Sequence, residues 1–261
     1  MVYAKKSLGQ NFLRSKKAIN DIVLAGKIIP GETVLEAGPG EGVLTEALLK
    51  AGAKVIAIEK DRRLVPLLSQ KFALGISSTQ LTLIEDDILK FDPSAYKLIP
   101  GSYKLIANIP YYITGAFIRK FLEAEKQPET MVILVQKEVA ERIVARDGKE
   151  SILSISVKAY GVPKIIGIVK AGCFVPPPSV DSAILSIENI SKKFFDGFSE
   201  EEFFCTVKMG FLHKRKKLSG NLRELGDIKS TLSRLGMDAN VRPEDLSLKE
   251  WREVTQLLQV D

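Results

Sequence analysis

Short apolar runs alternate along most of the chain with segments in which apolar residues recur every three or four positions. The runs have the length and β-branched content of buried strands, and the segments between them have the period of amphipathic helices. The predicted strands are residues 33–37, 54–58, 81–84, 103–107 and 130–135. The predicted helices are residues 42–51, 62–72, 115–123 and 138–145. Strands that are apolar throughout and separated by helices indicate a mostly parallel sheet covered on both faces.

The pattern changes toward the C-terminus. Two further strands, residues 165–169 and 183–187, are expected to pair antiparallel at one edge of the sheet. A polar segment at 191–199 precedes a series of short helices. These are predicted at residues 201–212, 218–225, 229–235 and 248–258, with a helix entry at 242–245. We therefore predict an α/β domain over residues 1–188, with a basic N-terminal arm, and a small α-helical domain over residues 189–261.

Composition fits a globular protein. The chain has 261 residues, 45% of them hydrophobic, and a mean hydropathy of +0.05. No apolar stretch approaches the roughly 18 residues that span a bilayer. The first eight residues contain two lysines and no hydrophobic core of a secretory signal. We expect a cytoplasmic protein without a membrane partner.

Cysteine and histidine are scarce, which limits the kinds of metal site and catalytic mechanism that the chain can have. Cys173 and Cys205 lack the closely spaced partners of a zinc site, so no metal is expected. Reduced thiols are favoured over a disulfide between them, given the cytoplasmic expectation. The sole histidine, His213, lies inside a cationic run, which argues against a Ser-His-Asp mechanism.

The net charge of +6 is concentrated in two places. The first 20 residues hold five basic side chains and no acidic one, and a second cluster follows His213. The candidate RNA-binding residues in these clusters are Lys5, Lys6, Arg14, Lys214, Arg215, Lys216 and Lys217. Two local clusters favour a polyanionic partner over the alternative of a solvated surface.

Glycine and acidic residues follow the first three predicted strands. Glu36-Ala37-Gly38-Pro39-Gly40-Glu41-Gly42 provides a tight turn that a ligand can approach closely. Glu59 ends the second strand, where a carboxylate can accept from both hydroxyls of a ribose, and Asp87 follows the third. A dinucleotide fingerprint would place glycine at position 43, which is Val43, so S-adenosylmethionine is favoured. The alternative is that both carboxylates are helix caps.

Asn108-Ile109-Pro110-Tyr111 follows the fourth predicted strand. The amide oxygen of Asn108 and the carbonyl of Pro110 can accept the two hydrogens of an exocyclic base amine, and Tyr111 can stack on the base. Holding the amine in this way favours a lone pair directed at a methyl donor, and no general base is required. The alternative is a turn with a core tyrosine. Asn11 and Leu13 of the N-terminal arm could cover the cofactor, and Phe174 could form the other wall of the base site, although a core position is its ordinary role.

With these segments assembled, the chain resembles the ribosomal RNA adenine dimethyltransferases, and specifically the KsgA branch that acts on small-subunit rRNA. The resemblance is nearly end to end. It includes residues 9–13, 36–42, 108–111, 135–142, 174–182 and 211–222, together with Glu59 and Asp87. It implies a class I S-adenosylmethionine-dependent methyltransferase fold, Rossmann-like, with a small helical C-terminal domain that binds RNA or the ribosome.

The resemblance also implies an activity. Members dimethylate N6 of two adjacent adenosines in the 3′-terminal hairpin loop of 16S rRNA within an assembling 30S subunit. The expected base site is Asn108, Pro110, Tyr111 and Phe174. The expected cofactor contacts are Gln10, Asn11, Leu13, Glu36, Gly38, Gly40, Glu59, Lys60, Asp87, Ile88 and Asn108. We expect a monomer.

Two alternatives remain open from the sequence. The sister group that dimethylates large-subunit rRNA shares the cofactor and base motifs, but residues 9–11 and 176–182 resemble the small-subunit branch more closely. The second alternative is a ribosome assembly factor with vestigial activity. The intact glycine segment and Asn108 argue against it. Departures are small: Ile109 replaces a frequent leucine, and Lys214 stands where an arginine is usual, so a bidentate phosphate contact at 214 is in doubt.

Overall fold

The chain forms two compact units in the computed structural model, which describes residues 4–5, 8–96, 98–213 and 215–258. One unit comprises Met1–Ala140 and Val162–Ser191, and the other comprises Glu141–Gly161 and Lys192–Asp261. The excursion of Glu141–Gly161 into the second unit was not predicted. The domain boundary expected at residue 189 stays a prediction.

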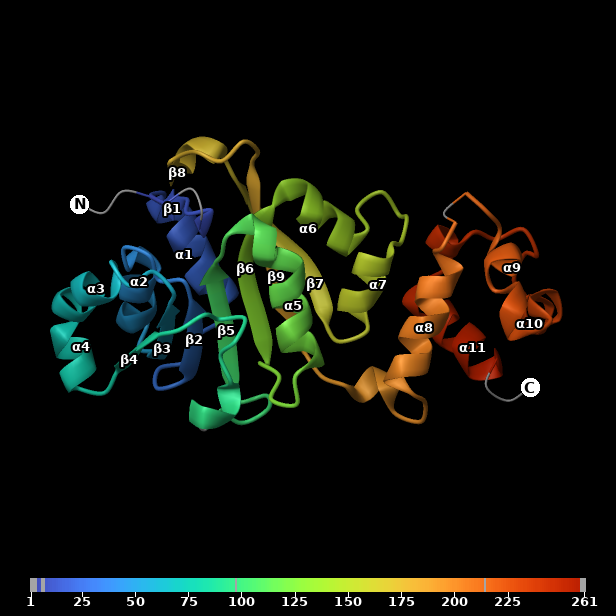
Figure 1. Cartoon of the computed structure of the whole chain (residues 1–261), viewed down its shortest axis with the longest axis horizontal. Helices are drawn as coiled ribbons and strands as arrows, with labels where there is room; N and C mark the ends of the chain where they lie inside the picture. The colour runs from blue at the N-terminus through green and yellow to red at the C-terminus, as the bar shows by residue number, and fades with distance from the viewer. Residues whose placement is uncertain (1–3, 6–7, 97, 214, 259–261) are drawn as a thin grey trace. The chain divides into compact units, whose positions relative to one another are not determined.

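The first unit is built on a seven-stranded sheet of order β4-β3-β2-β5-β6-β9-β7 (Figure 1). Its strands are β2 (Thr33–Ala37), β3 (Lys54–Glu59), β4 (Leu81–Glu85), β5 (Tyr103–Asn108), β6 (Thr130–Gln136), β7 (Val162–Val169) and β9 (Ser182–Glu188). β2 to β6 pair in parallel, whereas β9 pairs antiparallel with β6 and β7. The mostly parallel sheet and its antiparallel closing pair are therefore confirmed.

Helices cover the sheet, and the longer ones bury an apolar stripe. The helices of this unit are α1 (Lys16–Ala25), α2 (Val43–Lys50), α3 (Val65–Lys71), α4 (Ala73–Ser77), α5 (Thr114–Glu123) and the start of α6 (Lys137–Val144). α1 buries Ala18, Ile22 and Ala25 at helical spacing, and Ser15 caps its first turn by accepting from the Ala18 N–H. This stripe shares one hydrophobic core with α2 and with Val34 and other residues of that sheet face.

One predicted helix is wrong in its extent. Residues 62–72 were expected to form a single helix, but α3 begins at Val65 and ends at Lys71. The Asp61 carboxylate accepts from the backbone N–H of Arg63, which favours a turn before the helix. Phe72 leaves helical geometry (φ −111°, ψ 26°) and packs on Gly42, and a separate short helix follows.

A small second sheet joins two segments that are far apart in the sequence. β1 (Phe12–Leu13) pairs antiparallel with β8 (Phe174–Val175), with Phe12 opposite Val175 and Leu13 opposite Phe174. The bond from the Arg14 N–H to the Cys173 carbonyl, at 2.7 Å, extends this pairing. The N-terminal arm is thus held to the loop that precedes β9. We call residues 8–14 the strap.

The second unit is helical. Its helices are the end of α6, α7 (Ile152–Lys158), α8 (Glu200–Gly210), α9 (Leu218–Asn221), α10 (Ile228–Arg234) and α11 (Leu248–Leu258). Tyr160, Phe195 and Phe203 are among the aromatic residues that form its core. The predicted helix at 218–225 is shorter, because a 3₁₀ turn at Arg223–Leu225 replaces its second half. None of the helices in the described residues is long and apolar enough to cross a bilayer.

Candidate active site

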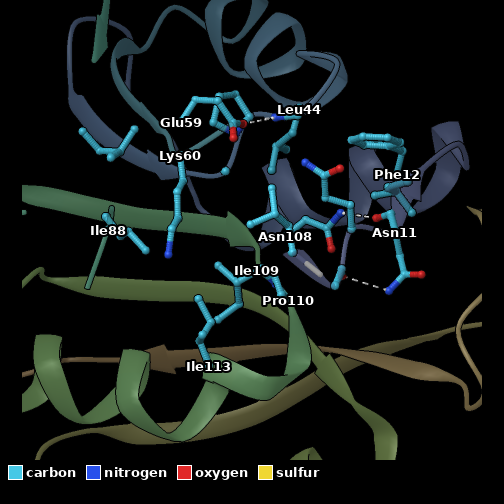
Figure 2. Close-up of a pocket in the computed structure, with 18 of the residues that line it drawn as sticks. Asn11, Phe12, Leu44, Glu59, Lys60, Ile88, Asn108, Ile109, Pro110 and Ile113 are labelled. Carbon is cyan, nitrogen blue, oxygen red and sulfur yellow. Dashed lines mark hydrogen bonds between the residues drawn. The ribbon is translucent and has the colours of Figure 1, made fainter. Parts of the chain in front are cut away.

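A cavity opens at the carboxyl ends of the central strands (Figure 2). The segments after β2, β3, β4 and β5 all contribute to its lining, together with the strap. Open α/β sheets bind ligands at this edge, where consecutive strand ends converge. Of the expected cofactor and base residues, the cavity lining includes Gln10, Asn11, Leu13, Gly38, Gly40, Glu59, Lys60, Asp87, Ile88, Asn108, Pro110 and Tyr111.

The glycine loop, residues 38–42, follows β2 with positive φ at all three glycines. A β-carbon on Gly40 would lie 3.2 Å from the Phe12 ring, so the strap rests directly on this loop. A β-carbon on Gly38 would lie 3.8 Å from the backbone carbonyl oxygen of Asn108. Gly42 has a different role, because its absent side chain makes room for Phe72. The strap and the end of β5 therefore both lie next to the glycine loop.

Glu59 ends β3 with its carboxylate in the cavity wall, 5% exposed. One of its oxygens accepts from the Gly40 N–H at 3.0 Å and the other accepts from the Asp61 N–H at 2.8 Å. Burial raises the pKa of Glu59, although these two N–H groups oppose the change. Each carboxylate oxygen has a second lone pair, so a buried acceptor is positioned for two neighbouring hydroxyl groups.

Asp87 follows β4 and forms an ion pair with Lys60 across the cavity wall, with 2.8 Å between Lys60 Nζ and Asp87 Oδ2. Its other oxygen accepts from the Leu89 N–H at 3.0 Å. Burial opposes ionisation of Asp87, but the bonds from Lys60 and Leu89 outweigh it and lower the pKa of the carboxyl. Ile88, 8% exposed, adds an apolar surface beside it.

Asn108 is the last residue of β5, and its side chain lies in the middle of the lining. Figure 2 shows Glu59 and Lys60 on one side of it and Asn11 and Phe12 on the other. Nδ2 of Asn108 donates to the carbonyl oxygen of Asn11 at 3.3 Å. Only the nitrogen of an amide can donate to a carbonyl, so this bond fixes the orientation of the amide group. Oδ1 is then the Asn108 atom left for a ligand donor.

Pro110 and Tyr111 continue from Asn108 along the same wall. The Pro110 carbonyl accepts from the Ile113 N–H at 3.2 Å and keeps a second lone pair. The Tyr111 hydroxyl is hydrogen-bonded to the Ser182 hydroxyl at the start of β9, at 2.5 Å. Burial raises the pKa of Tyr111, with the Ser182 bond opposing, so the phenol stays neutral. The ring is thus anchored at its far end.

Side-chain bonds of Gln10 and Arg14 hold the strap in place. Gln10 Nε2 donates to Asp61 Oδ2 at 2.8 Å, next to the Glu59 carboxylate. Arg14 forms an ion pair with Glu41 of the glycine loop, at 2.7 Å. Arg63 also bonds Asp61 and lowers the pKa of that carboxyl. These ties place Asn11 and Phe12 over the cavity.

Two expected site residues are not among those that line the cavity. Glu36 is 1% exposed on the β2 face toward α2, and neither of its oxygens has a hydrogen-bond partner of good geometry in the described structure. Burial raises the pKa of Glu36 to about 8, with Thr45 nearby opposing. Phe174 is 2% exposed and packs in the core with Leu13, its β1 partner. Their roles as cofactor contact and base wall stay predictions.

The model of the ribosomal RNA adenine dimethylase family matches residues 1–259. The chain belongs to this family. It is also 44% identical over 254 residues to the ribosomal RNA small subunit methyltransferase A of Dehalococcoides mccartyi, which covers 95% of this chain and 86% of that protein.

Two solved structures are similar to this dimethylase-family chain over 95% of its length. A dimethyladenosine transferase from Plasmodium falciparum matches with a TM-score of 0.82 and 25% identity, covering 98% of that chain. The 23S rRNA methyltransferase ErmE matches with a TM-score of 0.79 and 26% identity, covering 100% of that chain. The predicted class I methyltransferase fold is therefore confirmed.

The basic residues of this family member fall in both units. Lys5 and Arg14 are exposed in the first, and Arg215, Lys216 and Lys217 are exposed in the second. Lys217 donates to Asn240 at 2.5 Å. Lys6 and Lys214, also expected to bind RNA, lie outside the described residues. No cluster of metal-ligating side chains occurs in the part of the chain that the structure describes.

Sequence reasoning missed several cavity residues, including Phe12, Leu44 and Tyr112. Phe12 lies inside the quoted arm motif, so its contact with Gly40 could have been inferred from the neighbouring assignments. Leu44 gave no signal, because it lies in a helix of ordinary pattern. Tyr112 directly follows Tyr111, but the sequence does not say which of two adjacent tyrosines faces a ligand.

Proposed function

We propose that this protein transfers methyl groups from S-adenosylmethionine to N6 of adenosine in small-subunit ribosomal RNA. The observation that carries the proposal is that a candidate cofactor site and a candidate base site lie next to each other at one edge of the sheet. A carboxylate-lined cavity beside the glycine loop adjoins an amide, a carbonyl and a tyrosine at the end of β5. Membership of the rRNA adenine dimethylase family supports the reaction, and the 44% identity to a small-subunit enzyme supports the substrate.

The residues of the cavity fit S-adenosylmethionine. Glu59 offers a buried acceptor for the ribose hydroxyls, and Asp87 with Ile88 offers an acceptor beside an apolar wall for an adenine ring. Gly38 and Gly40 let the backbone approach a ligand closely. The cofactor supplies an electrophilic methyl group on a sulfonium. The strap residues Asn11 and Leu13 cover it and exclude water.

The base site acts by holding an amine. An exocyclic adenine amine is a poor nucleophile because its lone pair is delocalised into the ring. Asn108 Oδ1 and the second lone pair of the Pro110 carbonyl accept its two hydrogens and favour a more tetrahedral nitrogen. Tyr111, anchored by Ser182, stacks on the extruded base. The nitrogen becomes acidic once it is alkylated, so positioning and electrostatics suffice without a general base.

The finer features of substrate and partners are part of the same proposal. The target is a pair of adjacent adenosines in the 3′-terminal hairpin loop of 16S rRNA, presented by an assembling 30S subunit. Residues 189–261, with their exposed basic cluster, contact rRNA or the ribosome. The protein works as a cytoplasmic monomer, and Glu36 and Phe174 assist the cofactor and base sites.

Large-subunit rRNA is the substrate to be distinguished, because a 23S rRNA methyltransferase shares the fold at 26% identity. The higher identity to a small-subunit enzyme favours the small-subunit reaction. A binding factor with vestigial activity is disfavoured because the carboxylate of Glu59 and the amide of Asn108 are both held by hydrogen bonds in the cavity.

Mass spectrometry of nuclease-digested rRNA tests the proposal. Unmethylated small subunits and naked large-subunit rRNA are each incubated with the protein and S-adenosylmethionine. We expect N6,N6-dimethyladenosine in two adjacent positions of the small-subunit rRNA alone. Dimethylation of large-subunit rRNA would redirect the substrate assignment, and no methylation of either would reject the enzymatic function.

A further inference from the structure

Tyr112 is a cavity residue that the proposed chemistry does not use. Its side chain is 66% exposed, yet it lines the cavity beside the base site. Tyr96 is the other exposed aromatic side chain in the described structure, and it stacks on Phe91 with ring centroids 5.1 Å apart. A tyrosine ring of this size normally buries most of its surface. The exposed ring of Tyr112 is therefore a surface that a ligand could cover.

The backbone of the strap sets the position of this ring. A β-carbon on Gly9 would lie 3.1 Å from both Cδ1 and Cε1 of Tyr112, and 3.2 Å from Cβ of Pro110. The ring therefore rests against Gly9 and beside Pro110. Gly9 has a φ of +60°, where a side chain would be strained as well as crowded. Tyr112 is thus held between the strap and the base site rather than moving freely in solvent.

A cation lies nearby. Lys60 lines the same cavity as Tyr112 and is 54% exposed, with its Nζ paired to Asp87 Oδ2 at 2.8 Å. Figure 2 shows the Lys60 side chain extending along the cavity toward Ile109 and Ile113, which flank the turn that carries Tyr112. An exposed aromatic ring beside an exposed ammonium group is the combination that binds single-stranded nucleic acid, through base stacking and phosphate attraction.

We propose that Tyr112 is a stacking subsite for the nucleotide adjacent to the adenosine in the base site. The inference rests on the proposed function, because it assumes an RNA substrate whose target base is extruded. Extrusion leaves the neighbouring base without one of its stacking partners. Tyr111 and Tyr112 are consecutive, so one ring serves the target and the other serves its neighbour. Lys60 lies where it can attract the phosphate between the two nucleotides.

Three substitutions separate stacking from packing. Tyr112→Ala removes the ring, Tyr112→Leu keeps apolar bulk over Gly9 without an aromatic face, and Tyr112→Phe keeps the face. Steady-state methylation of unmethylated small subunits gives the KM for the particle and, separately, the KM for S-adenosylmethionine. Tyr96→Ala is the control for loss of an exposed tyrosine outside the cavity, and melting temperatures verify folding.

We expect Tyr112→Ala and Tyr112→Leu to raise the particle KM about fivefold or more, the lower end of the effect of one base–aromatic stack. The KM for the cofactor should stay within about twofold, and Tyr112→Phe should restore the particle KM. An unchanged particle KM in the leucine variant, with an active wild type, overturns the subsite and leaves the proposed function standing. A rise confined to the cofactor KM assigns Tyr112 to the cofactor site instead. A wild type that methylates no rRNA rejects both.

Discussion

The side-chain amide of Asn108 donates from Nδ2 to the backbone carbonyl oxygen of Asn11, 97 positions away along the chain, at 3.3 Å. The bond joins the end of β5 to the strap. It directs Oδ1 of Asn108 to the ligand side, because an amide presents only one acceptor atom. The strap therefore both covers the cavity and orients the group that holds the target amine.

Removing a bond that holds the strap in place should lower the rate of methyl transfer, even though the residue that is changed does not contact the reacting atoms. Gln10→Ala removes the bond from Nε2 to the Asp61 carboxylate, and hydrogen bonds to charged groups contribute about 1.5–3 kcal/mol. We expect about a tenfold loss in kcat/KM for S-adenosylmethionine, measured by steady-state kinetics. Gln70→Ala, an exposed glutamine on α3, is the control and should behave as wild type. Equal kinetics for both variants would show that the strap does not need this anchor.

Glu59→Gln tests the cofactor site. Glutamine has one acceptor oxygen, so one of the N–H groups of Gly40 and Asp61 would face an NH₂ group. That NH₂ group also cannot accept from a ribose hydroxyl, and losing a hydrogen bond to a charged group costs about 1.5–3 kcal/mol, so calorimetry should give a Kd for S-adenosylmethionine raised about 10- to 150-fold. Glu85→Gln, an exposed acid at the end of β4, should bind normally. A Kd for the Glu59 variant within twofold of wild type would contradict the assignment.

Glu36 should make stability depend on pH. The pKa of this carboxyl is about 8 in the folded protein and about 4.5 in the unfolded chain. Between these values the unfolded chain releases the proton and the folded protein keeps it, so stability falls as pH rises from about 4.5 to about 8. The contribution is fully present below about 4.5, and its loss amounts to at most about 5 kcal/mol.

Glu36→Gln removes this titration. Urea unfolding of the wild type and the variant between pH 5 and pH 8 gives two curves, and their difference isolates residue 36. We expect the wild type to lose several kcal/mol relative to the variant over this range. Parallel curves would mean that the folded protein holds Glu36 ionised at neutral pH.

The exposed basic cluster of the second unit should contribute to RNA affinity through counterion release. Replacing Arg215, Lys216 and Lys217 by glutamine should weaken binding to small-subunit rRNA and reduce the slope of log K against log salt by about 2 to 3. A charge-matched control replaces three other exposed lysines, Lys50, Lys54 and Lys229. If the two triple variants have the same slope, the RNA footprint lies elsewhere, as on the arm that carries Lys5 and Arg14.

The central sheet could be predicted because most of its strands contain an apolar run between turn residues. β7 is the exception, since it begins at Val162, before the predicted run, and its exposed and half-buried residues alternate. The helices at Lys16–Ala25 and Ile152–Lys158 were missed. The first carries Lys16 and Lys17 on its exposed side, and those charges were interpreted as part of the basic N-terminal arm. The helix has only three buried positions, Ala18, Ile22 and Ala25, and small residues give a weak periodic signal.

The site was predictable where residues follow strand ends. Glu59, Asp87 and Asn108 could be placed together because parallel strands deliver their carboxyl ends to one edge. The pairing of Leu13 with Phe174 depends on a contact across most of the chain, which local patterns do not encode. Glu36 was expected to contact the cofactor because of its place in the glycine motif. Alternation along β2 places it on the face toward α2, and its role as a cofactor contact stays a prediction.

The rate of methyl transfer by the Asn108→Ala variant is the most direct test of the proposed role of Asn108 in methylation. Single-turnover transfer from labelled S-adenosylmethionine to unmethylated small subunits is compared with wild type, alongside particle binding. Asn20→Ala, an exposed asparagine on α1, is the matched control. We predict that Asn108→Ala slows transfer at least about 100-fold, as loss of a positioned electrostatic contact does, while particle binding stays within about threefold. Transfer at the wild-type rate would contradict the role of Asn108 in holding the adenine amine.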